Sequence, residues 1–275
     1  MKRMTWCLIL ATVPASMFAA DTVVTIDQNS ALTGGVTPGD TAGFPVTISQ
    51  PGAYRLSGNL TVTEANTTAI LITSEAVTLD LNGFTISGPA LCSTRPTTCP
   101  SAGTGVGVQS GGSSATPVGP RAIRVFNGFV RGMSQAGILL NGEGSSVEKI
   151  TAYGNAGGGI TVAGSVLDSV ATQNGSFGIV GEIVRNSTAS ENLGDGIIID
   201  AGGVASNNVS SSNGGYGIFV QFGTANGNSS FVNKQFGLSA LCPSSLVGNT
   251  SVALGGAGIE TKGAGCVQAN NAGGQ

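Results

Sequence analysis

Short segments in which apolar and polar residues alternate recur along most of the chain, and none of them shows a helical period. From Gly137 onward each repeat begins with a glycine followed by isoleucine or leucine, and successive glycines lie 18 to 22 residues apart. Because strand side chains alternate between two faces, the residue after each glycine and the residue two positions later are predicted to point inward. The first inward column is Ile138, Ile160, Ile179, Ile197, Ile218, Leu238 and Ile259, and the second is Leu140, Val162, Gly181, Ile199, Val220, Ala240 and Thr261.

Asparagine recurs at two other positions of the repeat. One lies four residues before the glycine in five of the seven repeats, at Asn155, Asn174, Asn192, Asn213 and Asn233. A second, partial set is Asn208, Asn228 and Asn249. Asparagine tolerates the left-handed backbone of a tight turn, and stacked amides can hydrogen-bond one another. A period near 20 residues with several short strands therefore predicts an all-β parallel β-helix of roughly nine coils, with asparagine ladders at its corners.

The repeat is looser upstream, where two Asn-Gly-Phe segments beginning at Asn82 and Asn127 lie 45 residues apart. That spacing exceeds two coils, and residues 89–120 between them are rich in Gly, Ser, Thr and Pro. We therefore expect a long loop over residues 89–120. Residues 21–60 are punctuated by Gly and Pro and are predicted to form an N-terminal cap, with the β-helix over residues 61–275.

Residues 1–20 have the pattern of a signal peptide. Lys2 and Arg3 precede an apolar run over residues 6–13, and small residues follow it. The run is too short to span a bilayer, so the prediction is an exported protein, either periplasmic or secreted, without a membrane anchor. After removal of this segment the chain has nine Lys and Arg against 14 Asp and Glu, a net charge of −5.

Four cysteines remain after the signal peptide: Cys92, Cys99, Cys242 and Cys266. An even number in an oxidising compartment favours two disulfides over metal ligation. Of the three connectivities we predict the local one, Cys92–Cys99 with Cys242–Cys266. The alternative is four buried thiols.

The composition narrows the range of functions. The chain has no histidine, which excludes Ser-His-Asp and Cys-His catalysis and any zinc site built on imidazole. Its net charge is −3 and it has no basic run, which argues against a nucleic-acid partner.

The segment Val77–Gly88, VTLDLNGFTISG, followed by coils of the pattern Asn-x-x-x-Gly-Ile, resembles the right-handed parallel β-helix superfamily. It is similar in particular to exported bacterial parallel β-helix repeat proteins and more distantly to pectate lyases, over roughly residues 45–270. The resemblance implies a fold but no single function, because such coils occur in lyases, hydrolases, esterases, epimerases, tailspikes and adhesins. The histidine motifs of polygalacturonase-like and epimerase-like enzymes are missing, and so is the Trp-x-Asp-His stretch of pectate lyases.

One column of the repeat carries candidate chemistry. Four residues past the glycine, Glu182 and Asp200 are predicted to lie on adjacent coils about 5 Å apart, with Gln221 next to them. Two carboxylates at that distance raise one pKa or bind Ca²⁺, and Arg185 is the candidate base of a lyase. The alternative is a solvated outer row in which Arg185 offsets the negative charge.

Two further surfaces bear on partners. For sugar stacking the main candidates are Tyr153, Tyr216, Phe219 and Phe231. The expected substrate-binding residues are Gln221, Tyr216 and Phe219. An outward column also contains apolar residues on several coils, which predicts either a contact between copies of the chain or cover by the protein's own long loop or N-terminal segment. That apolar stripe is Leu139, Val180, Ile198 and Phe219.

Two functional hypotheses follow. The first is an exported, non-catalytic β-helix that presents a ladder surface to an extended polysaccharide or a protein partner. The second is a Ca²⁺-assisted polysaccharide lyase, or a related carbohydrate-active enzyme, acting on an acidic glycan through Glu182, Asp200 and Arg185.

Overall fold

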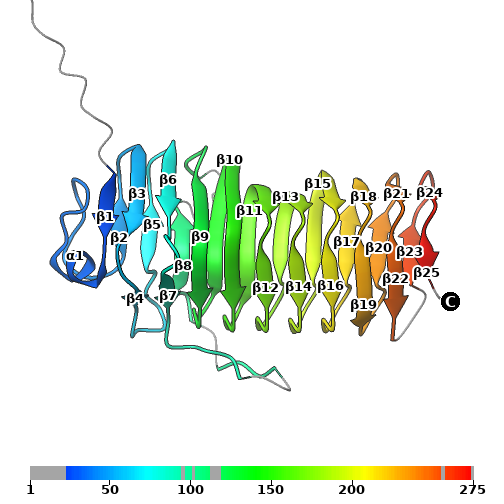
Figure 1. Ribbon diagram of the computed structural model, residues 1–275, viewed down its shortest axis with the longest axis horizontal. Coiled ribbons are helices and arrows are strands. Elements are labelled where there is room, and N and C mark those ends of the chain that lie inside the picture. The colour runs from blue at the N-terminus through cyan, green and yellow to red at the C-terminus, as the bar shows by residue number, and fades with distance from the viewer. Residues whose placement is uncertain (1–22, 94–96, 101–102, 112–118, 255–257, 274–275) are drawn as a thin grey trace, which may run out of the picture.

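The computed structural model describes residues 23–93, 97–100, 103–111, 119–254 and 258–273. Over these residues the chain winds into a solenoid whose coils stack along one axis, from β1 at one end to β25 at the other (Figure 1). The described strands of neighbouring coils pair in parallel, which is the defining feature of a parallel β-helix.

Each coil crosses three faces of the solenoid, which we call face 1, face 2 and face 3. Five long strands turn from one face into the next and therefore appear in more than one group. Face 1 is formed by β2 (Val46–Ile48), β5 (Ile70–Ile72), β8 (Val106–Ser110), the first parts of β10 (Ala136–Tyr153), β11 (Gly158–Leu167), β13 (Ile179–Arg185) and β15 (Ile197–Ser206), and β17 (Ile218–Gln221), β20 (Leu238–Leu241) and β23 (Ile259–Lys262).

Face 2 is formed by β1 (Val24–Ile26), β3 (Gly52–Leu56), β6 (Val77–Asp80), the first part of β9 (Arg124–Arg131), later parts of β10, β11, β13 and β15, and β18 (Thr224–Asn226), β21 (Ser245–Val247) and β24 (Val267–Ala269). Face 3 is formed by β4 (Leu60–Thr61), β7 (Thr85–Ser87), the ends of β9 and β10, β12 (Val170–Thr172), β14 (Thr188–Ser190), β16 (Val209–Ser211), β19 (Ser229–Asn233), β22 (Thr250–Ala253) and β25 (Ala272–Gly273). The solenoid has about ten coils, close to the nine expected from the period.

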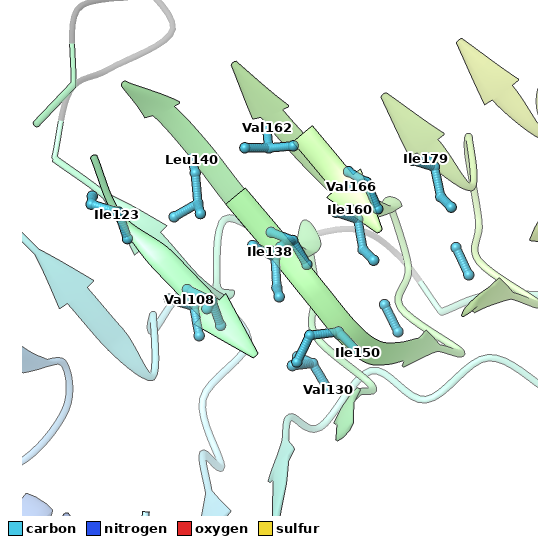
Figure 2. Close-up of a cluster of buried hydrophobic side chains, with 14 of the residues drawn as sticks. Val108, Ile123, Val130, Ile138, Leu140, Ile150, Ile160, Val162, Val166 and Ile179 are labelled. Carbon is cyan, nitrogen blue, oxygen red and sulfur yellow. The ribbon is translucent and has the colours of Figure 1, made fainter. Parts of the chain in front are cut away.

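The two predicted inward columns fill the core. Ile138, Ile160 and Ile179 stack from coil to coil (Figure 2). All three are completely buried, as are Leu140 and Ile199. Only in the last coil are the inward residues part-exposed, because no further described coil lies beyond them. Burial of each such side chain contributes about 1.5–3 kcal/mol, so the stacked aliphatic columns are the main stabilising term of the fold.

The asparagine ladders are confirmed. Along the first, the side-chain oxygen of each asparagine accepts the backbone N–H and the side-chain N–H of the asparagine one coil earlier; for Asn192 and Asn174 the distances are 3.0 and 2.9 Å. The residue before each ladder asparagine has a left-handed backbone, for example Gln173 with φ 58° and Glu191 with φ 55°. This turn aims the amide into the coil, where its hydrogen bonds satisfy backbone groups that the corner takes out of the strand pairing.

The second ladder is longer than the sequence suggested. Asn208, Asn228 and Asn249 repeat the same hydrogen bonds, and Asn271 extends them by one coil. On the N-terminal side, the hydroxyl of Ser187 takes the amide's place.

The expected N-terminal cap is largely built from coils. β1 to β4 pair in parallel with β3, β5, β6 and β7, so the solenoid begins well before residue 61. These strands span only two to five residues between Gly and Pro, which is why the segment looks irregular in the sequence. The helix α1 (Gln28–Thr33) covers the end, with Asp27 as its N-cap and Ala31 buried.

The expected loop over residues 89–120 is interrupted by a strand. β8 pairs with β5 on one side and β10 on the other, so it is a coil strand and not part of an excursion. Its short sequence, VGVQS, buries both valines but is hidden among the flanking Gly, Ser and Thr. The 45-residue spacing therefore contains a strand of the solenoid in addition to loop residues.

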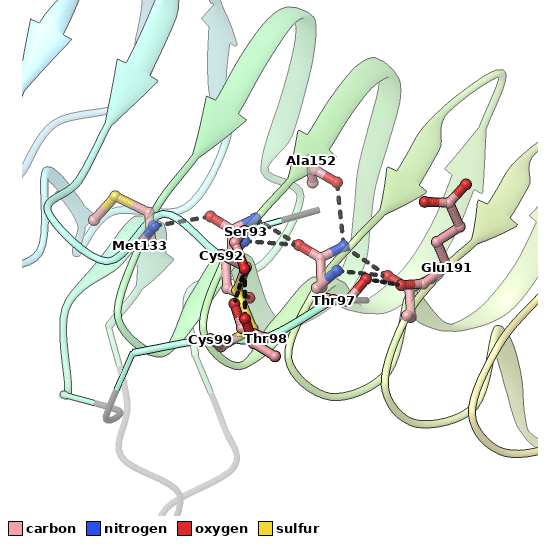
Figure 3. The surroundings of a disulfide bond; sticks show 11 residues. Cys92, Ser93, Thr97, Thr98, Cys99, Met133, Ala152 and Glu191 are labelled. Carbon is pink, nitrogen blue, oxygen red and sulfur yellow. Dashed lines mark hydrogen bonds between the residues drawn. A yellow bond between two sulfur atoms is a disulfide. The ribbon is translucent and has the colours of Figure 1, made fainter. Parts of the chain in front are cut away.

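Both predicted disulfides are confirmed. Cys92 pairs with Cys99, with Cα atoms 4.1 Å apart, and Cys242 pairs with Cys266, with Cα atoms 4.9 Å apart. The first bond lies in the excursion after β7, which runs along the corner beside the first ladder (Figure 3). There the Cys92 N–H donates to the Gly154 carbonyl and the Thr97 hydroxyl to the Glu191 carbonyl, so the loop is fastened to several coils.

In the part of the chain that the structure describes, no helix is long and apolar enough to cross a membrane. The predicted signal peptide, residues 1–20, lies outside the described residues.

Candidate functional site

An aromatic cluster lies on the outer surface of face 1 toward the C-terminal end. The rings of Tyr216 and Phe219 are stacked with centroids 5.6 Å apart, and those of Tyr216 and Phe236 with centroids 6.3 Å apart. Interplanar angles of 19° and 18° make the three rings nearly parallel, and each ring is part-exposed. We call these three residues the aromatic row.

A polar network borders the aromatic row on its C-terminal side. The Lys262 ammonium donates to the Tyr216 hydroxyl at 3.1 Å and lies 5.4 Å from the centroid of the ring. The same ammonium is 3.1 Å from the Glu260 carboxylate, which also accepts the Ser239 hydroxyl at 2.9 Å. The hydrogen bonds to Tyr216 and Glu260 raise the pKa of Lys262, so this side chain stays charged while it orients the tyrosine.

Asp195 borders the aromatic row on its N-terminal side. Its carboxylate accepts the backbone N–H of Tyr216 at 2.7 Å and lies over Gly215, where a Cβ atom would collide with it. Burial raises the pKa of Asp195, and the Tyr216 N–H opposes that effect only in part. The carboxylate thus lies against the backbone of Gly215 and Tyr216.

The two predicted acidic residues end their face 1 segments on neighbouring coils. Gly181 and Ile199 are paired across β13 and β15, and Glu182 and Asp200 follow them directly. Glu182 is exposed, whereas Asp200 is half-buried and burial raises its pKa. The register of β13 and β15 then shifts, so the two side chains sit at an irregularity where face 1 turns into face 2.

Arg185 lies beyond that irregularity. It pairs with Leu167 and Ser206 in the face 2 part of β13, and its side chain is exposed. Gln221 ends β17, the face 1 strand that follows β15. The structure therefore gathers Glu182, Asp200 and Gln221 along one edge of face 1, with Arg185 on the adjoining face.

Among the described residues, no group of three or more His, Cys, Asp or Glu is placed to hold a metal ion. The calcium ligands expected from the sequence, Glu182 and Asp200, would thus act as a pair and require further oxygen ligands.

The outward apolar stripe has the predicted register. Leu139, Thr161, Val180, Ile198 and Phe219 are successive partners along face 1. All are part-exposed, and Phe219 joins the stripe to the aromatic row.

The disulfide loop is fastened at the corner between faces 3 and 1, where a shallow pocket of about 370 Å³ is lined by Thr97, Glu191, Asn192, Leu193, Ser212, Gly214 and Lys234.

Sequence reasoning named Tyr216 and Phe219 but missed Phe236 and Asp195. A signal was present, because Asp195, Tyr216 and Phe236 all stand directly before the glycine of their repeats. Read as a column, that position places the three side chains on successive coils. The contact between Tyr216 and Lys262, which are 46 residues apart, had no such signal.

The structure thus defines a parallel β-helix with a mixed aromatic and acidic outer face. No protein-family model matches the chain, and no curated protein matches it. Among solved structures, the A-module of the mannuronan C-5 epimerase AlgE4 from Azotobacter vinelandii has a TM-score of 0.57 at 15% identity, covering 86% of this chain and 82% of that one. This likeness shows the shared fold.

Two other solved structures are more distant. A variant of the periplasmic alginate epimerase AlgG gives a TM-score of 0.44 at 14% identity, covering 92% of this chain and 83% of that one. The Dettilon tailspike protein gives 0.39 at 16% identity, covering 81% and 59%.

Proposed function

We propose that the outer surface of face 1 binds an extended polysaccharide without cleaving it. The observation that carries this proposal is the aromatic row, a part-exposed apolar surface of near-parallel rings bordered by Asp195, Glu260 and Lys262. Ligand sites combine aromatic surface with a few fixed polar groups in this way. Tyrosine suits such a surface because its ring is apolar while its hydroxyl forms hydrogen bonds.

The solenoid suits an extended ligand. Successive coils lie about 4.8 Å apart, so outward side chains of face 1 form a straight track along the axis. The mannuronan epimerase module, which shares the fold, acts on a polysaccharide according to its name. A polymer lying along face 1 would meet the aromatic row and then Gln221 and Asp200 at its edge.

The placement of Arg185 favours binding over cleavage. A Ca²⁺-assisted lyase would need its base beside the carboxylates that hold the metal and substrate. Arg185 is on face 2, past the irregularity that follows Gly181, whereas Glu182 and Asp200 end the face 1 segments. The lyase remains the alternative. It is tested below by incubating the protein with the polysaccharides of the binding panel and looking for cleavage products.

We also propose export to the periplasm or the medium. The signal-peptide pattern of residues 1–20 and the two disulfides support it, because disulfides persist in oxidising compartments. N-terminal sequencing of protein recovered from the periplasm and medium should begin after the apolar run; an intact Met1 on cytoplasmic protein would contradict export.

The decisive experiment is affinity electrophoresis of the purified protein through gels that contain a panel of soluble polysaccharides. At least one polysaccharide should retard the protein, and Tyr216→Ala should weaken that binding at least about tenfold, a loss of roughly 1.4 kcal/mol. Tyr153→Ala is the matched control: the sequence made Tyr153 a stacking candidate, but the structure places this part-exposed tyrosine in the face 3 part of β10, on another face than the aromatic row. Circular dichroism checks that both variants fold.

Two results would count against the proposal. Equal binding by Tyr216→Ala and the parent protein would place the ligand elsewhere. Shortened or unsaturated products after incubation with any of the polysaccharides would show catalysis, and loss of those products in Arg185→Ala would establish the lyase instead.

A further inference from the structure

Most charged residues on the described strands of face 1 are acidic. Within the described residues, their acidic members are Glu182, Asp200 and Glu260, and Asp195 lies two residues before β15, beside the aromatic row. Lys262 is the single basic residue in these face 1 segments. The surface around the aromatic row is therefore net negative.

Among the described residues, the one cation of the face 1 strands is already engaged, and Lys234, in the loop before β20, lines the corner pocket. Lys262 is 3.1 Å from Glu260 and 3.1 Å from the Tyr216 hydroxyl, so its charge is offset and its position fixed by the protein's own groups. Recognition of a sugar carboxylate or sulfate depends on Arg or Lys that can direct free N–H donors at the anion. Face 1 lacks such a donor set in the described residues.

The arginines lie on other faces. Arg55 and Arg124 extend from the face 2 strands β3 and β9, where they form ion pairs with Asp80 and Glu148. Arg185 is also on face 2, and Arg131 pairs with Tyr153 on face 3. The arginines of the described strands are thus separated from the aromatic row.

What face 1 offers in abundance is hydrogen-bond acceptors. Carboxylate oxygens accept hydroxyl protons in short, charge-assisted hydrogen bonds, and the Gln221 amide can both accept and donate. An uncharged glycan presents many hydroxyl donors and apolar C–H surface, which matches acceptors placed around aromatic rings. A polyanionic glycan would instead meet repulsion from the fixed carboxylates.

We infer that the polysaccharide bound by face 1 is uncharged, and that the carboxylates on and beside face 1 select against uronate and sulfated glycans. This inference rests on the proposed binding function of face 1. It adds the chemical class of the ligand, and it differs from what the name of the mannuronan epimerase module implies for that protein.

The test compares neutral and acidic probes of similar length. Binding to a soluble β-glucan and a galactomannan is measured beside binding to alginate and polygalacturonate, each at low and high salt. We expect at least one neutral probe to bind tenfold or more tightly than either acidic probe. Its affinity should change less than twofold with salt, because screening acts on charged ligands.

Charge removal provides the second arm. Glu182→Gln/Asp200→Asn should strengthen binding to alginate at least threefold at low salt, whereas Tyr216→Ala should abolish binding to the neutral probe and Tyr153→Ala should retain it. Tighter, Tyr216-dependent binding to an acidic probe would overturn this inference and leave the binding function intact. If Tyr216→Ala and the parent protein bind every probe equally, or neither binds any, the binding function itself fails.

Discussion

Replacing Asn192 by alanine tests whether the asparagine ladder stabilises the solenoid. The Asn192 side chain is almost completely buried and takes part in four hydrogen bonds. Its oxygen accepts the Asn174 backbone and side-chain N–H groups at 3.0 and 2.9 Å. Its amide donates to the Ala171 carbonyl at 3.1 Å and to the Asn213 side-chain oxygen at 3.0 Å.

The cost follows from what each partner retains. The Asn174 side chain keeps its bond to the Ala152 carbonyl, and the Asn213 oxygen still accepts the backbone N–H of residue 192. The buried Asn174 backbone N–H loses its partner, which costs about 1–3 kcal/mol, and each of the other lost bonds costs roughly 0.5–1.5 kcal/mol. We expect Asn192→Ala to lower the free energy of unfolding by about 3–6 kcal/mol, a large share of the stability of a domain.

Urea unfolding followed by circular dichroism measures this loss, with the m-value compared between variants because repeat proteins can unfold in parts. Asn226→Ala is the matched control: Asn226 is an exposed asparagine of β18, and we expect a change within about 0.5 kcal/mol. If Asn192→Ala were as stable as the control, the ladder would be a consequence of coil stacking rather than a cause of its stability.

Three further predictions concern the corners, the buried acid and the second disulfide. Val232 has φ 58°, a left-handed conformation that a β-branched residue strongly disfavours, and its side chain is 47% exposed. Val232→Asn should therefore raise the free energy of unfolding by about 1 kcal/mol and move the urea midpoint upward. A lower midpoint would refute the strain argument. Burial raises the pKa of Asp195 above 3.8 in the folded protein, so the folded state binds this proton more readily than the unfolded state does. The contribution of Asp195 to the free energy of unfolding therefore falls as the pH rises through the raised pKa. Asp195→Asn should consequently raise Tm at neutral pH. The Tm difference between the variant and the parent protein should shrink as the pH is lowered toward the ordinary pKa of Asp. A Tm difference that does not change with pH would contradict a raised pKa of Asp195. A double serine substitution that removes the Cys242–Cys266 bond, which spans 24 residues, should lower the free energy of unfolding by roughly 3 kcal/mol. Urea unfolding without reductant measures this loss, and an unchanged midpoint would show that the bond does not constrain the unfolded chain.

The parts of this protein that repeat were predictable residue by residue. The buried columns through Ile160 and Ile199 and the ladders through Asn192 and Asn228 follow from one rule, because residues one period apart occupy the same place on successive coils. The disulfides were predictable for a related reason, since each joins cysteines that are close in sequence or one coil apart.

The parts that break the period were not predictable. β8 was assigned to a loop because its five residues lie between stretches of loop residues whose lengths follow no repeat. The coils formed by β2 to β4 were assigned to a cap because their strands are short and interrupted by Gly and Pro. Both segments become strands because neighbouring coils supply pairing partners on either side, which is tertiary information.

The sequence alone determined the solenoid, its core, its corner ladders and its cysteine pairing, because each depends on a local pattern repeated at a fixed interval. Only the tertiary structure decided the composition of face 1. Lys262 reaches Tyr216 from two coils away, Asp195 becomes half-buried against Gly215, and a shift in register places Arg185 on another face than Glu182. These outcomes depend on side-chain reach and on where each coil bends, and neither quantity is encoded in the period.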